Sequence, residues 1–249
     1  MKRIMLVVAY DGTNYCGWQV QPNGITIEEV LNRSLTELLR EPVTVTGASR
    51  TDSGVHALGN IAVFDSETRI PGEKISYALN QRLPDDIIIR ESREVEADFH
   101  PRRCVSRKTY CYRILNSRFP IPTERLYSYF VYNPLQEELM AEAASYLIGE
   151  HDFKSFCSAR SQVIDTTRII YGIKVERSGE AITIRITGSG FLYNMVRIIA
   201  GTLIKVGLGS MQPLRVKEIL EKKNRAFAGP KAPAQGLTLE KIEYINKIY

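Results

Sequence analysis

The sequence predicts an α+β protein made of two domains that pack side by side. The chain has 249 residues, which is enough for two domains of about 100–150 residues each. Strand and helix signals are mixed in both halves. Residues 98–103 contain Pro101 and a change in the sign of the charge. We therefore place the boundary there and expect domains at 1–102 and 103–249.

The first half begins with a continuous apolar run at 4–10, which predicts a buried central strand. Residues 26–40 predict a helix with one apolar face. Thr26 and Glu29 form a capping box at its start, and Pro42 ends it. Shorter elements follow, with strands at 43–46, 61–64 and 87–90 and a short helix at 73–82.

The second half opens on an alternating strand at 108–115. Asn133 is expected to cap a helix that has Pro134 at its first position and runs to residue 148. The later elements are a half-buried strand at 182–187, a helix at 191–206, a helix opened by Pro213, and a last strand at 237–242.

The charge distribution points to a polyanionic partner for one face. The net charge is +5, made up of −5 over residues 1–100 and +10 over residues 101–249. The densest basic stretch contains no acid and comprises Arg102, Arg103, Arg107, Lys108, Arg113 and Arg118. A nucleic acid is one explanation. A solvated basic edge strand is the other, and charge alone does not separate them.

Composition argues against several other classes of protein. The chain has no apolar run of about 18 residues, so no transmembrane helix is expected. The first ten residues read as a strand and not as a signal peptide. None of the four cysteines forms a C-x-x-C pair, which favours reduced thiols over a zinc site. We expect a cytoplasmic protein with no metal.

Two segments carry charges that call for an explanation. The helix at 191–206 is apolar all round, yet it contains Arg197. A buried arginine requires a carboxylate or several acceptors, unless it snorkels to an edge. The segment at 47–57 presents Asp52 between small residues, with Arg50 before it and His56 after it. Catalytic groups concentrate on such loops, although an ordinary Asx-turn has the same composition.

A third segment combines aromatic and basic residues. On a strand at 108–114, Tyr110 and Tyr112 share one face. Aromatic residues among basic ones can stack an unpaired base. Two core tyrosines are the alternative reading.

Together these segments resemble the tRNA pseudouridine synthase A family. Arg-Thr-Asp-Ser-Gly-Val-His-Ala at 50–57 resembles its active-site motif. Further similar motifs occur in the expected order at 10–13, 17–19, 108–113, 151–153, 191–197 and 232–237. Pro101 is a local departure, since an alanine is more typical there.

The resemblance implies isomerisation of uridine to pseudouridine at positions 38, 39 and 40 of the tRNA anticodon stem–loop. It implies a homodimer without a cofactor. It also implies two ferredoxin/RRM-like α/β halves that form a continuous mixed, mainly antiparallel sheet with a central basic cleft. Asp52 would be the catalytic carboxylate, paired with Arg197, and Tyr110 would contact the target base.

Less specific roles are expected for other basic residues. Arg50 would fill the space left by the flipped base or hold a phosphate, and Arg102, Arg103, Arg107 and Lys108 would contact RNA phosphates. His56 is expected to be structural.

Two other functions are compatible with parts of the pattern. A non-catalytic RNA-binding module would explain the aromatic and basic strand, but it needs no acid–arginine pair. A metal-free glycosidase would need a second carboxylate across the bond, and no second acid stands out.

Overall fold

The computed structural model describes residues 1–158 and 163–245. The chain divides into two compact units, Met1–Ser106 with Leu239–Tyr249, and Arg107–Thr238. The division expected from the sequence, at 102/103, leaves the C-terminal segment in the second half. In the structure the segment from Leu239 onward belongs to the first unit.

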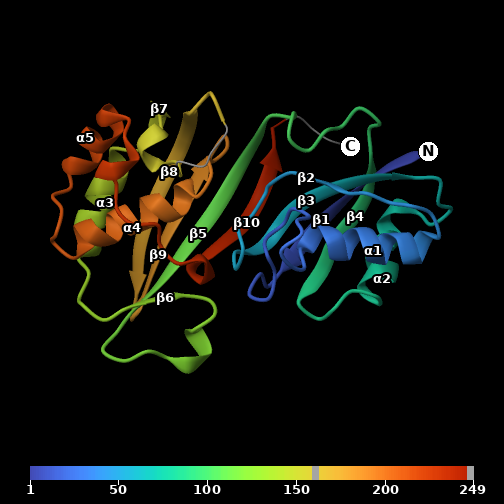
Figure 1. The fold of residues 1–249 in the computed structure, drawn as a ribbon, viewed down its shortest axis with the longest axis horizontal. Coiled ribbons are helices and arrows are strands. Elements are labelled where there is room, and N and C mark those ends of the chain that lie inside the picture. The colour runs from blue at the N-terminus through green and yellow to red at the C-terminus, as the bar shows by residue number, and fades with distance from the viewer. Residues whose placement is uncertain (159–162, 246–249) are drawn as a thin grey trace. The chain divides into compact units, whose positions relative to one another are not determined.

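The strands of the first unit follow the order β4-β1-β3-β10, with β2 paired to β3. Their bounds are β1 Lys2–Tyr10, β2 Thr46–Gly47, β3 His56–Ser66, β4 Ile87–Val95 and β10 Leu237–Tyr244, and the helices are α1 Ile27–Leu39 and α2 Ile75–Asn80 (Figure 1). β1 pairs antiparallel with both β3 and β4. The predicted central strand is thus confirmed.

Helix α1 begins and ends close to the predicted positions. Thr26 is the N-cap, and its side chain accepts a hydrogen bond from the Glu29 backbone N–H at 3.4 Å. The strand expected at 43–46 is mostly absent. The backbone N–H groups of Val43 and Val45 donate to side chains of α1, those of Thr36 and Asn32. Donors engaged in this way are not available to a sheet ladder.

The second unit has the strand order β5-β9-β8-β7, with β6 parallel to β5. The strands are β5 Ser106–Asn116, β6 Tyr129–Val131, β7 Gly149–Asp152, β8 Thr167–Ser178 and β9 Ala181–Gly188, and the helices are α3 Glu137–Ser145, α4 Met195–Gly207 and α5 Arg215–Lys222 (Figure 1). Short 3-10 helices lie at Gly72–Lys74, Pro122–Glu124, Lys154–Phe156, Arg225–Phe227 and Ala234–Gly236. The α+β class and the mostly antiparallel pairing are confirmed. The continuous sheet and the basic cleft concern how the units sit together, and they stay predictions.

The core of the second unit lies on one face of its sheet. Ile182, Ile184 and Ile186 of β9 are buried in strict alternation with half-buried residues, as predicted. Tyr110 and Tyr112 of β5 pair with this buried row. Strands β7 and β8 are absent from the elements expected from the sequence, although apolar residues of β8 do alternate, at Ile169, Tyr171, Ile173 and Val175.

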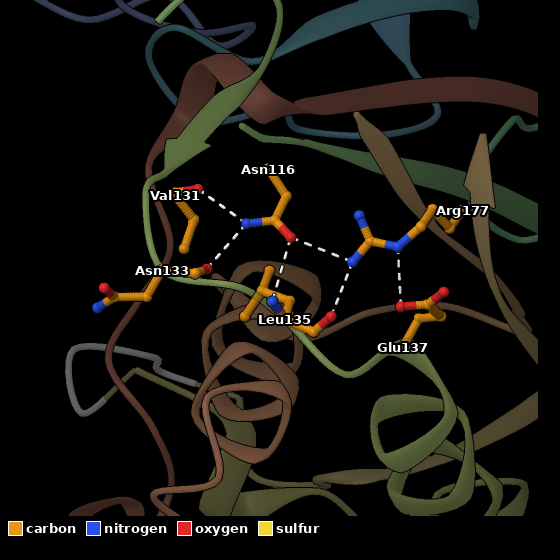
Figure 2. Close-up of polar contacts among 6 residues, drawn as sticks. All are labelled: Asn116, Val131, Asn133, Leu135, Glu137 and Arg177. Atoms are coloured by element: carbon orange, nitrogen blue, oxygen red, sulfur yellow. Dashed lines mark hydrogen bonds and ion pairs between the residues drawn. The ribbon is translucent and has the colours of Figure 1, made fainter. Parts of the chain in front are cut away.

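Helix α3 begins later than Asn133 and Pro134 predict, at Glu137. The preceding segment is held instead by the side chain of Asn116 at the end of β5 (Figure 2). Its Nδ2 donates to Asn133 O at 2.8 Å, and its Oδ1 accepts from Leu135 N at 3.1 Å. These bonds fix residues 133–135 in a non-helical conformation.

An ion pair closes the same network from β8 (Figure 2). The Arg177 guanidinium donates to Leu135 O at 2.7 Å and pairs with Glu137 at 2.8 Å. Hydrogen bonding to Arg177 lowers the pKa of the Glu137 carboxyl. An acid in the first turn is also favourable for the helix dipole. The helix therefore begins at an acid whose charge suits its N-terminus and whose side chain Arg177 holds.

Candidate active site

Asp52 lies on a tight turn between β2 and β3. The backbone N–H of Val55 donates to Asp52 O at 3.1 Å, and Gly54 adopts a φ of 75°. A positive φ at this place in a turn suits glycine. Asp52 itself is half-buried. Asp52, Ser53 and Gly54 therefore belong to a backbone turn, with Asp52 at its first position.

The segment 11–19 supports this turn through its backbone. Trp18 N donates to Thr51 O at 3.0 Å, while Tyr15 O accepts from Ser53 Oγ at 3.1 Å and from Gly54 N at 3.3 Å. Gly17, with φ 89°, lies so close that an added Cβ would be 2.6 Å from Thr51 O. The two segments thus touch with no room for a side chain between them.

His56 is buried and bonded to the backbone. Its Nδ1 accepts from Gly12 N at 3.1 Å and lies 3.1 Å from Asp11 Oδ1. This environment agrees with a structural histidine.

We call residues 47–55, from the end of β2 to the start of β3, the Asp52 loop. Two arginines of the first unit concern it: Arg50 lies within the loop, and Arg102 contacts its first residue. Arg102 Nε donates to Gly47 O at 2.7 Å, at the start of the loop. Desolvation lowers the pKa of Arg102, and the positive charge of Arg50 lowers it further. Arg50 is exposed. Like charges held in proximity attract an anion between them.

Tyr110 of β5 is a buried side chain of the second unit, 6% exposed. Its ring contacts Phe191 edge-on, with the ring centroids 5.2 Å apart and the planes at 84°. Tyr112 is buried completely, and its hydroxyl donates to Pro233 O at 2.9 Å. Burial raises the pKa of Tyr112. The core-tyrosine reading holds for Tyr112.

Arg197 is buried in helix α4 and is only 8% exposed, so it does not snorkel to an edge. Its Nε donates to Ala232 O at 2.8 Å, and Nη1 donates to Asn194 Oδ1 at 3.1 Å. Asn194 precedes the helix with φ 61° and also donates to Ser158 Oγ at 2.9 Å. The helix and two acceptors of the same unit therefore set the position of the guanidinium.

The remaining basic residues lie at the surface. Arg103 and Arg107 are exposed and Lys108 is half-buried. The Arg107 guanidinium lies over the Tyr171 ring, 4.9 Å from its centroid. A guanidinium stacked on an aromatic ring stays charged, and the ring restricts its orientation.

Within residues 1–158 and 163–245, no group of three or more His, Cys, Asp or Glu side chains could hold a metal ion. The helices in the same ranges include none that is long and apolar enough to cross a membrane.

Comparison with known proteins identifies the family. A family model described as tRNA pseudouridine synthase matches residues 6–102 and 143–245. The tRNA pseudouridine synthase A of Thermoanaerobacter sp. (strain X514) is 50% identical over 98% of this chain and 100% of that protein. The chain belongs to the tRNA pseudouridine synthase A family. As a member of this family it is an isomerase.

Other members of the family extend the match. Proteins of the same name from Acetivibrio thermocellus and Brevibacillus brevis are 46% and 45% identical, each over 98% of this chain and 100% of the relative. A solved Cbf5-Nop10-Gar1 complex is 11% identical with a TM-score of 0.33, covering 97% of this chain and 57% of that chain, and this likeness is too weak to add to the argument.

Several further residues support these side chains, and among them only Asn60 lies outside the motifs quoted from the sequence. Tyr10 and Asn60 contact the Asp52 loop, Phe191 contacts Tyr110, and Asn194 binds Arg197. Asn60 offers one signal, because it is an amide directly before the apolar run at 61–64. Such a residue needs buried partners.

Proposed function

We propose that this isomerase converts uridine to pseudouridine at positions 38, 39 and 40 of the tRNA anticodon stem–loop. Membership in the tRNA pseudouridine synthase A family supports this substrate. The observation that carries the proposal is the Asp52 carboxylate, half-buried on a turn that backbone contacts hold on both sides. A fixed acid of this kind suits covalent or acid–base catalysis.

The reaction is an isomerisation in which the glycosidic bond moves. The bond from C1′ to N1 breaks, the base turns, and C1′ joins C5, while the C5 hydrogen is released and N1 gains a proton. The atoms balance without an oxidant or a co-reactant. Asp52 starts this sequence by attacking C1′, attacking C6 or removing a sugar proton, and these three routes remain open.

Tyr110 and Arg50 are proposed to contact the flipped nucleotide. The base must leave its stack before a side chain can reach it, which costs a few kcal/mol. Stacking on an aromatic ring offsets about 1–3 kcal/mol of such a cost. Arg50 either fills the vacated space or binds a phosphate, and the nearby charge of Arg102 supports the second role.

Arg197 is proposed to pair with Asp52 during the reaction. Its burial in an apolar helix supports a need for an acidic partner. An arginine beside a carboxylate favours the ionised form of that carboxylate. Arg102, Arg103, Arg107 and Lys108 are proposed to bind RNA phosphates, and the family supports a homodimer.

The test is a tritium-release assay on tRNA labelled at uridine C5, combined with mapping of pseudouridine by position. Three tRNA substrates would carry a single uridine at 38, 39 or 40. Asp52→Asn should abolish release, a loss on the order of 10⁴-fold or more, as for removal of a nucleophile. The matched control is Asp85→Asn, an exposed acid of the same unit. An active Asp52→Asn enzyme would overturn the proposal.

A further inference from the structure

A buried chain of polar side chains lies beside the Asp52 loop, within the first unit. It joins Asn60 of β3, Tyr10 at the end of β1, and Thr51. Asn60 Nδ2 donates to the Tyr10 hydroxyl at 3.3 Å, and the hydroxyls of Tyr10 and Thr51 are 2.7 Å apart. All three side chains are buried, and Asn60 is 0% exposed.

The Asn60 amide uses each of its polar atoms. The same Nδ2 donates to Ser49 O at 2.9 Å, and Oδ1 accepts from Ile61 N at 2.9 Å. Each group in such a buried network depends on the others, since an unpaired donor or acceptor costs about 1–3 kcal/mol. Two points of the loop, Ser49 O and the Thr51 hydroxyl, are therefore tied to one amide.

The ties act on the residue that precedes Asp52. Thr51 is held at its hydroxyl by Tyr10 and at its carbonyl by the Trp18 backbone N–H, 3.0 Å away. Tyr10 is itself fixed against the Trp18 ring, with the ring centroids 6.1 Å apart. Rotation of the Thr51 backbone would break one of these contacts, and the same rotation would swing the Asp52 side chain.

We infer that Tyr10, Asn60 and Thr51 are positioning residues, which set the orientation of Asp52 for the reaction. The inference rests on the proposed catalytic role of Asp52. These residues act through the loop backbone and not on the substrate. A displacement of about 1 Å at a reacting group can reduce the rate on the order of 10²-fold.

Paired substitutions at Thr51 separate positioning from general stability. Thr51→Val keeps the shape and removes the hydroxyl, whereas Thr51→Ser keeps the hydroxyl. Tyr10→Phe breaks the chain at its other member and leaves the ring on Trp18. The control is Tyr244→Phe, which removes a hydroxyl that donates to Pro101 O in the same unit. The readouts are the single-turnover rate at saturating enzyme, the Kd for tRNA, and the melting temperature.

Thr51→Val and Tyr10→Phe should each lower the single-turnover rate by about 10- to 100-fold, with the Kd for tRNA unchanged. Thr51→Ser should restore most of the rate. The double variant Tyr10→Phe, Thr51→Val should be no slower than the slower single variant, because both break the same contact. Tyr244→Phe should lower the melting temperature without slowing the reaction.

Two results would overturn the inference, and they are distinguishable. If Asp52→Asn is inactive while Thr51→Val and Tyr10→Phe react at the normal rate, the chain of side chains is structural only and the proposed function stands. If Asp52→Asn is active, the proposed function fails and positioning of Asp52 has no meaning.

Discussion

The Asp52 loop and the Arg197 helix hold a charged side chain in two different ways. Asp52 lies on irregular backbone, whose shape depends on bonds from β1, β3 and the segment 11–19. Arg197 lies in α4, where the helix ladder fixes the backbone and only the side chain needs partners, at Ala232 and Asn194. Substitutions at the loop supports should therefore displace Asp52, whereas a substitution at Arg197 should leave the backbone of α4 in place.

After the loss of activity expected for Asp52→Asn, the largest effect is expected from a substitution on the helix side. Arg197→Met keeps an apolar side chain in the helix but removes the guanidinium. Turnover should fall on the order of 10²–10³-fold, the scale for loss of a preorganised charged donor. The free energy of unfolding should fall by about 1–3 kcal/mol, because the acceptors at Ala232 and Asn194 lose their donor. The matched control is Lys205→Met, an exposed cation of the same helix.

A double-mutant cycle extends this prediction to Asp52. Arg197→Met and Asp52→Asn are combined, and unfolding by urea gives the coupling free energy. The proposed pairing requires non-additive stability changes. Strictly additive changes would show that the two residues do not interact, whatever the effect of each on turnover.

The next effect concerns Tyr110, which lies in the same unit as Arg197. Tyr110→Phe should retain tRNA binding but slow turnover by about 10- to 100-fold if the hydroxyl takes part in proton transfer. Tyr110→Ala should also weaken binding, since stacking on a base contributes about 1–3 kcal/mol. Tyr112→Phe is the control, because its hydroxyl bonds to Pro233 in the core. Normal turnover in both Tyr110 variants would show that Tyr110 only packs in the core and does not contact the target base.

The two regions also differ in what could be predicted from the sequence. Apolar residues on all sides predict the burial of α4, and the one charge within them singles out Arg197. The supports of the loop have no such pattern, because they are distant in sequence and several are backbone atoms. Tyr10 ends an apolar strand and begins the motif at 10–13, but neither pattern indicates its bond to Thr51, which spans 41 residues. Tertiary contacts of this kind are set by packing and not by local propensity.

Local hydrogen bonds account for the errors in the predicted elements. Asn133 and Pro134 have the composition of a helix start, but the Asn116 side chain holds this segment in another conformation (Figure 2). Similarly, Thr36 and Asn32 of α1 take the donors that a strand at 43–46 would use. The competing side chain is 17 residues away in sequence from Asn133 in the first case. In the second case the competing side chains belong to the helix that precedes the segment.

A smaller effect tests how closely the loop depends on its backbone support. Gly17→Ala would place a Cβ 2.6 Å from Thr51 O and 3.0 Å from the Asp52 carbonyl carbon. The positive φ adds a cost of about 1–2 kcal/mol. The loop must shift, so turnover should fall by about tenfold together with stability. Gly179→Ala is the matched control, since it has a positive φ of 59° and open space around it.

The melting temperature and the single-turnover rate of both glycine variants decide the outcome. Gly179→Ala should lose stability alone. Gly17→Ala could instead lose stability to the same degree and react at the normal rate. That result would show that the close contact with Thr51 does not position Asp52.

The smallest effect on the rate of the chemical step is expected from the basic residues between β4 and β5, Arg102 and Arg103. Arg103→Ala should weaken tRNA binding and reduce the slope of log K against log salt by about 0.7–0.9, the value for one phosphate contact. Its turnover at saturating tRNA should be normal, because Arg103 is exposed. Lys217→Ala, which removes an exposed cation on α5, is the control for a general change in net charge.

Arg102→Ala should differ from Arg103→Ala, because Arg102 also donates to Gly47 O at the start of the Asp52 loop. It should change the salt slope to the same extent and, in addition, slow the single-turnover rate by a few-fold. Equal kinetics in the two variants would show that the Arg102–Gly47 bond does not affect the loop. An unchanged salt slope in both would place the RNA on another face.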